Sequence, residues 1–215
     1  YLKNRDYDLA IEAYQQAIEL NPGFFEAFTA IGVAYTESNR DKQAIEPLKN
    51  ALKINPDDDV AYLNLGIAYK NLGQHEEAID AFLELIRIRF KDPEAYFLLA
   101  SEYFVTDLYD DAIQRFKDAI RLEPDHIDAH FQLSQVYDET GDLEESLREF
   151  NKVTQIQPRN LEGHYRKGDI YQRLGDDKAA VKSFEQALVI ESGHTLSNYQ
   201  VGLSYIKMDR HEDAL

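Results

Sequence analysis

The sequence contains no cysteine. This absence excludes disulfide frameworks, cysteine nucleophiles and thiolate metal sites, although it does not decide the compartment. Cationic side chains are also scarce, because 23 Lys and Arg residues stand against 40 Asp and Glu residues and leave a formal charge of −17. A surface this acidic repels phosphate groups, so we expect neither nucleic acid nor an anionic membrane as the main partner.

The sequence also has no apolar run of the length that spans a bilayer, and no signal-like apolar stretch opens it. We therefore expect no membrane insertion in this segment and a cytoplasmic location. The chain begins at Tyr1 and its only methionine is Met208, so we expect that the natural start lies outside it. Apolar residues make up 44%, which favours a packed protein over a disordered one.

What the sequence does contain is an ungapped repeat with a period of 34 residues, marked by columns of equivalent positions. A tyrosine column consists of Tyr1, Tyr35, Tyr69, Tyr103, Tyr137, Tyr171 and Tyr205. An alanine-like column consists of Ala10, Ala44, Ala78, Ala112, Ser146, Ala180 and Ala214. A column of small residues consists of Gly32, Gly66, Ala100, Ser134, Gly168 and Gly202. A column of large apolar residues consists of Tyr14, Leu48, Phe82, Phe116, Phe150 and Phe184.

The spacing of apolar residues predicts two helices in each repeat. In one repeat the helical period runs over Val60–Leu72, breaks at Gly73 and resumes over Glu76–Ile88. The small column then has a physical reason, because antiparallel helices approach closely only where one side chain is nearly absent. Prolines close most repeats, since the residue before a proline is disfavoured in a helix.

These features resemble the tetratricopeptide repeat, whose core is matched here by Leu65, Gly66 and Tyr69, together with the alanine, aromatic and proline columns. The resemblance implies an all-α fold, a right-handed α-solenoid superhelix of antiparallel helix pairs. It also implies that the first helix of each repeat lines a concave groove. We predict a single array over residues 1–215, with repeats at 1–24 (partial), 25–58, 59–92, 93–126, 127–160, 161–194 and 195–215 (partial). Twelve helices and no strands are expected.

Departures from the repeat carry expectations of their own. Phe90 replaces the closing proline of its repeat, so we expect a longer second helix at that junction. His130, His164 and Asn198 replace a large aromatic residue near the start of the first helix, and Lys167 occupies an otherwise apolar column, so we expect weaker packing in the last two repeats.

No catalytic motif is found. Segments of the form GxGxxG or GxxxxGK are missing, so no phosphate-binding loop is indicated. The six histidines fall into repeat-equivalent pairs, His75 with His211, His126 with His194 and His130 with His164, as a shared structural role would produce. We therefore predict no metal, no cofactor and no enzymatic activity for this segment, although a catalytic domain outside it stays open.

Residues at positions 2, 5, 6, 9, 12 and 13 of each repeat contact ligands in the family that the chain resembles. The peptide-binding groove predicted in this way consists of Phe97, Leu98, Phe104, Val105, Phe131, Gln135, Tyr165, Arg166 and Arg173. In one interpretation an apolar peptide segment covers Phe97 and Phe104, while the two arginines hold a carboxylate. In the other, the position-5 aromatics only help to pack neighbouring first helices, and the arginines join Asp169 in an ion ladder along the helix.

The best-known clamp of the family, which grips the acidic C-terminus of chaperones, is not matched. Asn64 occupies one clamp column, but the position-2 column contains no lysine and begins with Glu26. A co-chaperone of that type is therefore not expected.

The leading functional prediction is a non-enzymatic scaffold that binds a peptide or protein partner. The alternatives are a substrate-recruiting domain of a larger enzyme, for example a glycosyltransferase, and a scaffold that assembles with copies of itself. We expect end-to-end association between copies because the apolar faces of the first and last repeats lack a covering neighbour.

Overall fold

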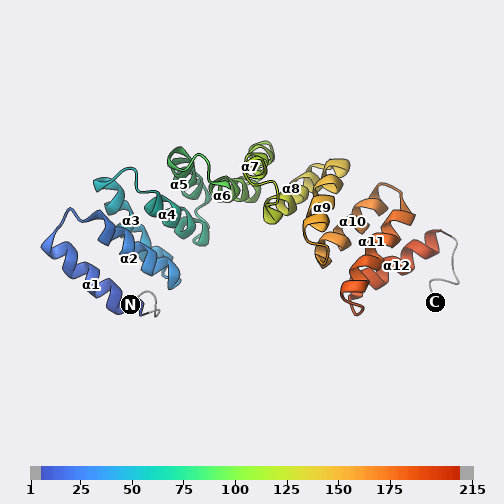
Figure 1. The fold of residues 1–215 in the computed structure, drawn as a ribbon, viewed down its shortest axis with the longest axis horizontal. Helices are drawn as coiled ribbons and strands as arrows, with labels where there is room; N and C mark the ends of the chain where they lie inside the picture. Colours follow the sequence, from blue (N-terminus) through green and yellow to red (C-terminus); the bar gives the residue numbers. More distant parts are fainter. Residues whose placement is uncertain (1–5, 209–215) are drawn as a thin grey trace. The chain divides into compact units, whose positions relative to one another are not determined.

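The computed structural model describes residues 6–208, and these residues form twelve α-helices and no strand (Figure 1). The expected all-α solenoid of helix pairs is thereby confirmed. The helices are α1 (Tyr7–Leu20), α2 (Phe25–Glu37), α3 (Asp41–Ile54), α4 (Asp59–Asn71), α5 (His75–Ile88), α6 (Pro93–Val105), α7 (Tyr109–Leu122), α8 (Ile127–Thr140), α9 (Leu143–Ile156), α10 (Leu161–Arg173), α11 (Asp177–Ile190) and α12 (Thr195–Lys207). Residues Tyr1, His211, Ala214 and Leu215, which the repeat also involves, lie outside the described part.

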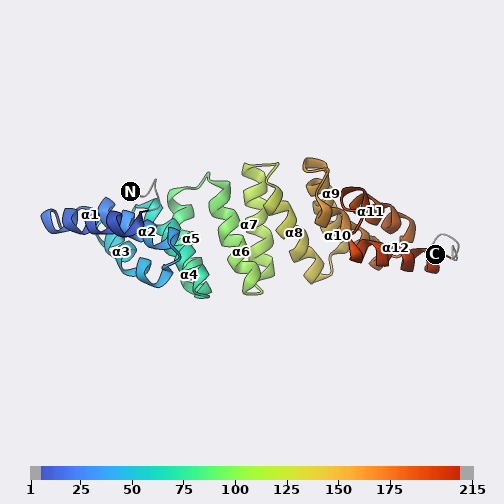
Figure 2. The ribbon, with the colours of Figure 1, turned by 90° about the horizontal axis from the view of Figure 1, so that it is seen from below.

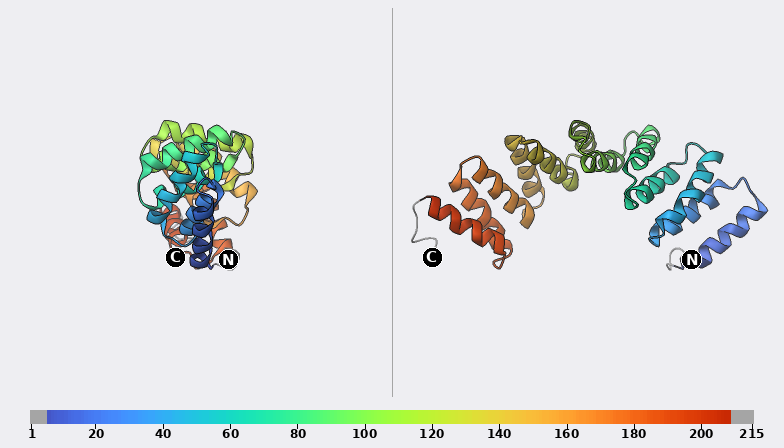
Figure 3. Two further views of the ribbon diagram at one scale, coloured as in Figure 1. Left: turned by 90° about the vertical axis from the view of Figure 1, so that its left-hand side faces the viewer. Right: turned by 180° about the vertical axis from the view of Figure 1, so that it is seen from behind.

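The helices fall into two compact units that divide after Leu122. Unit 1 contains α1 to α7 and unit 2 contains α8 to α12. Within each unit, the two helices of a repeat lie against each other, as α4 and α5 do in unit 1 (Figure 2) and α10 and α11 do in unit 2 (Figure 3). In unit 1 the first helices α2 and α4 also touch. This contact places the ligand-contacting positions of two repeats side by side.

The small column brings the paired helices together as expected. A Cβ atom added to Gly66 of α4 would overlap the ring of Phe82 on α5, and one added to Gly32 of α2 would overlap Leu48 on α3. Phe82 and Leu48 are fully buried. The large apolar side chain of the second helix therefore fills the space that the small residue of the first helix leaves open.

Left-handed backbone ends the first helices where the sequence predicts a break. Gly73, Gly141 and Gly175 have φ of 71°, 83° and 81°, a region that favours glycine. They follow α4, α8 and α10, none of which continues through its glycine. The prediction that each repeat breaks at these glycines is confirmed.

The longer helix expected at Phe90 was wrong. Helix α5 has 14 residues, as do α3 and α7, whose repeats end in proline. Local capping fixes the start of α6, because the Asp92 side chain accepts a hydrogen bond from Glu94 N and Pro93 occupies the first turn. Arg89 pairs with both Asp59 and Asp92, which holds the connection in place of the missing proline.

The polar residues that replace an aromatic near the start of the first helix each make the same kind of hydrogen bond, and Tyr96 makes it in its own repeat. The side chain reaches the backbone carbonyl six residues earlier, in the loop that joins the repeats. These pairs are Tyr96 with Phe90 (3.2 Å), His130 with Pro124 (3.0 Å), His164 with Pro158 (3.0 Å) and Asn198 with Ser192 (3.1 Å). The histidines and the asparagine thus make the contact that the tyrosine hydroxyl makes in its own repeat.

Candidate functional site

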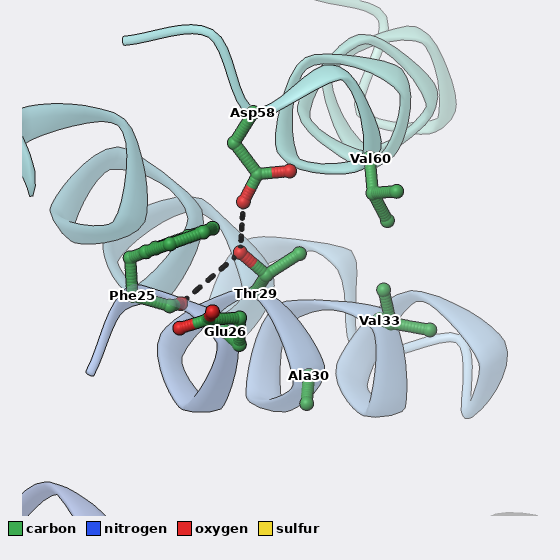
Figure 4. A pocket seen from close by; sticks show the side chains of 7 residues that line it. All are labelled: Phe25, Glu26, Thr29, Ala30, Val33, Asp58 and Val60. Carbon is green, nitrogen blue, oxygen red and sulfur yellow. Dashed lines mark hydrogen bonds between the residues drawn. The ribbon is translucent and has the colours of Figure 1, made fainter. Parts of the chain in front are cut away.

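A pocket of about 430 Å³ lies between α2 and α4 in unit 1 (Figure 4). This volume falls in the range of about 300–1,000 Å³ that is common for ligand sites. Val60 of α4 lies opposite Val33 of α2 in Figure 4. The residues that line the pocket are Phe25, Glu26, Thr29, Ala30, Val33, Asp58 and Val60.

The pocket is open because Thr29 occupies repeat position 5. In three other repeats this position carries an aromatic ring that contacts the buried phenylalanine of the second helix. The ring centroids are 6.0 Å apart for Phe97 and Phe116, 5.5 Å for Phe131 and Phe150, and 5.7 Å for Tyr165 and Phe184. In the pocket repeat the second helix carries Leu48 in place of phenylalanine, and the threonine does not fill the space above α2.

One buried hydrogen bond forms a wall of the pocket. The Thr29 hydroxyl lies within hydrogen-bond distance of Asp58 Oδ2 and of the Phe25 carbonyl oxygen, 3.2 Å away (Figure 4). Asp58 is only 6% exposed, and its Oδ1 accepts the Ala61 backbone N–H at 3.1 Å as the N-cap of α4. The carboxylate therefore has a donor on each oxygen and is stabilised at the positive end of a helix.

Four of the residues predicted from sequence lie on α6 in unit 1, and they differ in what they offer a ligand. Phe97 contacts Phe116 of its own repeat, and Leu98 is 9% exposed in the hydrophobic core. Phe104 is half-buried beside the ring of Tyr109, whereas Val105 is 59% exposed. Phe104 and Val105 therefore supply the apolar surface on this helix.

Three more predicted residues, Phe131, Gln135 and Tyr165, lie on α8 and α10 of unit 2 and are half-buried. Phe131 meets Phe150 edge-on, and Tyr165 contacts both Phe184 and His194. The position-5 aromatics thus have the packing role of the second interpretation. Their ring partners on α7, α9 and α11 belong to the second helix of the same repeat, whereas that interpretation named the neighbouring first helices.

The two predicted arginines lie on α10, and each has a carboxylate partner within unit 2. Arg166 Nε donates to Glu162 Oε1 at 2.6 Å. Burial lowers the pKa of Arg166, but the hydrogen bond to Glu162 and the charges of Glu162, Tyr165 and Asp138 together outweigh burial and leave this pKa above its ordinary value. Arg173 pairs with Asp138 of α8 and lies 3.8 Å from Asp169. These contacts match the ion-ladder interpretation for Arg173 and Asp169, while Arg166 uses Glu162.

The histidines of the described chain have structural partners. His126 and His194 cap α8 and α12 through Nδ1, which accepts a backbone N–H in each case. His75 lies 2.8 Å from the buried Glu102. Residues 6–208 contain no cluster of three or more metal-ligating side chains, and none of their helices is long and apolar enough to cross a membrane.

The pocket between α2 and α4 is not among the sites predicted from the sequence. Its residues Glu26, Thr29, Ala30 and Val33 occupy positions 2, 5, 6 and 9 of their repeat, and Val60 occupies position 2 of the next. The available signal was the small residue at position 5. We selected the repeats with large aromatic residues at this position, and in those repeats the ring fills the corresponding space.

Sequence models described as TPR repeat and tetratricopeptide repeat match residues 1–38, 32–73, 60–92, 107–165 and 161–193. A search of curated protein sequences finds no match. Among solved structures, MamA is similar with 29% identity and a TM-score of 0.73, over 75% of this chain and 95% of MamA. A MamA fragment from Desulfovibrio magneticus RS-1 is 20% identical with a TM-score of 0.73, over 80% of this chain and 97% of the fragment.

YrrB, described as a TPR protein with an unusual peptide-binding site, is also similar in fold. It is 22% identical with a TM-score of 0.77, over 88% of this chain and 97% of YrrB. The repeat register, the helix pairs and these matches agree, and the chain belongs to the tetratricopeptide repeat family.

Proposed function

We propose that this chain is a non-enzymatic protein-interaction module, and that the pocket between α2 and α4 receives an apolar side chain of a peptide or protein partner. The observation that carries the proposal is the pocket itself. It is open, largely apolar and formed by the positions at which the repeat family contacts its ligands. Thr29 leaves a space there that an aromatic ring fills in three other repeats.

The pocket suits an apolar group for an energetic reason. Its polar wall atoms are already satisfied by the hydrogen bonds around Thr29 and Asp58. A partner side chain would gain by leaving water and would not have to replace a lost hydrogen bond. Full burial of one aliphatic or aromatic side chain is worth about 1.5–3 kcal/mol, which is the size of an interface anchor.

The exposed Val105 and the adjacent Phe104 support a second contact surface in unit 1. The binding of a partner carboxylate by Arg166 and Arg173 stays a prediction, and a partner would compete there with Glu162, Asp138 and Asp169. A recruiting domain of a larger enzyme would use the same surfaces. The full-length gene separates that alternative from a free-standing scaffold.

The proposal is tested with the variant Ala30→Leu. Ala30 lines the pocket, and leucine is a good helix former that would occupy the space. Peptides selected on the wild-type chain from a random display library are measured against both proteins by fluorescence anisotropy. We expect the variant to bind at least about tenfold more weakly, a loss of about 1.4 kcal/mol.

The matched control is Ala13→Leu, the same substitution at an exposed position of α1 in unit 1. It should bind like the wild type, and circular dichroism should show that both variants fold. Unchanged affinity of a folded Ala30→Leu variant for every selected peptide would contradict the proposal, and so would a library that yields no binder.

A further inference from the structure

Resting on the proposed function, we propose that the pocket selects a partner segment in which the apolar anchor is flanked by lysine or arginine. Two features of the α2–α4 site lead to this conclusion. The Thr29 hydroxyl and both Asp58 oxygens in its wall already have hydrogen-bond partners. The charged groups among its lining residues are both carboxylates, Glu26 and Asp58.

The interior disfavours a polar anchor because the polar side-chain atoms of its wall already have hydrogen-bond partners within the chain. The Thr29 hydroxyl faces two acceptors with its single proton, and both oxygens of Asp58 have donors. Among residues 6–208, the buried side-chain oxygen that lacks a partner belongs to Asp177, far from the pocket in the sequence. A polar anchor would lose its hydrogen bonds to water and gain none in return.

The lining carboxylates favour a cation beside the anchor. Glu26 is exposed at repeat position 2, and within residues 6–208 no lysine, arginine or histidine lies at ion-pair distance from it. Asp58 is buried behind Thr29, so water screens its charge poorly. An acidic flank would meet repulsion from both groups, whereas a basic flank would pair with Glu26.

The carboxylates next to Asp58 in the sequence show why Glu26 is left for a partner. Asp57 pairs with Arg87 at 2.8 Å, and Asp59 pairs with Arg89 at 2.5 Å. Both carboxylates thus have a cationic partner within unit 1. The chain as a whole carries −17, which also favours the approach of a basic segment.

Position 2 also separates this pocket from the chaperone-type clamp. That clamp presents a lysine in this column to an acidic tail, whereas here the column carries Glu26 in the pocket repeat and the apolar Val60 in the next. The sign of the charge at equivalent positions is reversed.

The experiment uses four synthetic peptides with identical Gly-Ser flanks and the centres Lys-Phe-Lys, Gln-Phe-Gln, Glu-Phe-Glu and Lys-Ser-Lys. Each is titrated into the whole chain while the NMR signals of Ala30, Val33 and Val60 are followed. We expect Lys-Phe-Lys to bind about two- to fivefold more tightly than Gln-Phe-Gln, as one exposed ion pair allows. Glu-Phe-Glu should bind more weakly than both, and Lys-Ser-Lys should leave the pocket signals unchanged.

Two variants separate the local charge from the overall charge of the chain. Glu26→Gln should reduce the preference for Lys-Phe-Lys over Gln-Phe-Gln, because it removes the exposed carboxylate beside the anchor. Glu37→Gln, which removes the same charge at the end of α2 away from the lining residues, should keep the preference. The preference should also shrink as salt is raised from about 0.05 to 0.5 M.

The two proposals fail in different ways. Equal binding of Glu-Phe-Glu and Lys-Phe-Lys at the pocket, or a preference that Glu26→Gln reduces no more than Glu37→Gln does, would overturn the charge preference and leave the proposed function standing. If no peptide shifts the pocket signals, the proposed function fails, and the charge preference fails with it.

Discussion

Repeats 25–58 and 161–194 have the same helices and differ in what they present to a partner. Each pairs a 13-residue first helix with a 14-residue second helix. In both, a glycine of the first helix makes room for a buried side chain of the second, Leu48 in one and Phe184 in the other. At position 5, however, the first has Thr29 and a pocket, and the second has Tyr165 against Phe184.

The comparison shows that the residues that hold a repeat together are separate from those that shape its surface. The small and large apolar columns set the distance between the paired helices, and they agree in both repeats. Position 5 lies beside this contact, so its size changes the surface without changing the backbone.

Phe184→Ala should destabilise repeat 161–194, in which Tyr165 packs against Phe184. Phe184 is fully buried, contacts Tyr165 and sits over Gly168. Its truncation should lower the free energy of unfolding of unit 2 by about 3–5 kcal/mol, because it removes apolar burial and leaves a cavity. Urea denaturation measures the change. Val189→Ala on the same helix is 78% exposed and should shift stability by less than about 0.5 kcal/mol. A similar loss of unfolding free energy in both variants would contradict this account of repeat 161–194.

Thr29→Val should lower the stability of repeat 25–58, because it removes the hydrogen bond from Thr29 to Asp58. The substitution keeps the shape of the side chain but removes the donor to Asp58, whose carboxylate is buried. An unsatisfied buried acceptor costs about 1–3 kcal/mol, so unit 1 should lose stability by this amount. Thr29→Ser keeps the hydroxyl and serves as the matched control in thermal unfolding. If valine is tolerated as well as serine, the hydrogen bond does not stabilise the wall of the pocket.

The pH dependence of stability should distinguish the equivalent histidines of repeats 127–160 and 161–194. His130 faces Glu149 Oε2 at 2.6 Å and the Pro124 carbonyl at 3.0 Å, so both ring nitrogens face acceptors. Burial and nearby Lys152 lower the pKa of His130, but the two hydrogen bonds and the charge of Glu149 outweigh them and raise it above 6.5. Its stabilising contribution is therefore complete below about pH 6.5 and is lost as the pH rises through the raised value.

The measurement is urea denaturation of the chain between pH 6 and 9. His130→Tyr introduces the residue found at this position in the repeat of Tyr96, and it should remove part of the decline in stability with rising pH. His164→Tyr is the control, because His164 contacts the Pro158 carbonyl and has no carboxylate partner within residues 6–208. A decline that is the same in the wild type and in both variants would show that His130 does not contribute.

The smallest expected effect concerns association between copies. Tyr199 occupies the same position as Tyr165 but is 63% exposed, and Leu196 and Ile206 of α12 are also exposed. We predict weak association through this face, seen as a rise in apparent mass between two concentrations in light scattering. Tyr199→Ser should reduce the rise, and Val189→Ser on α11 should not. A monomer at both concentrations would contradict the prediction.

The helices were predictable because they depend on local signals. The apolar period, the glycines with positive φ and the closing prolines act within a few residues, and the structure follows them at α4, α5 and the loop at Gly73. The prediction failed at Phe90, where a missing proline suggested a longer helix. Instead, Asp92 caps the start of α6, and Arg89 forms ion pairs in the loop before it. The contact between Arg89 and Asp59 spans 30 residues.

The repeat and the all-α architecture follow from the sequence, because a 34-residue register repeats the same local and neighbouring contacts along the chain. The negative charge follows from composition. Tertiary structure alone decided which face is open. Thr29 and Asp58 are 29 residues apart and meet only when α4 settles against α2. Whether a space between helices is filled depends on the sizes of side chains from several helices at once, and no single segment of the sequence contains all of these side chains.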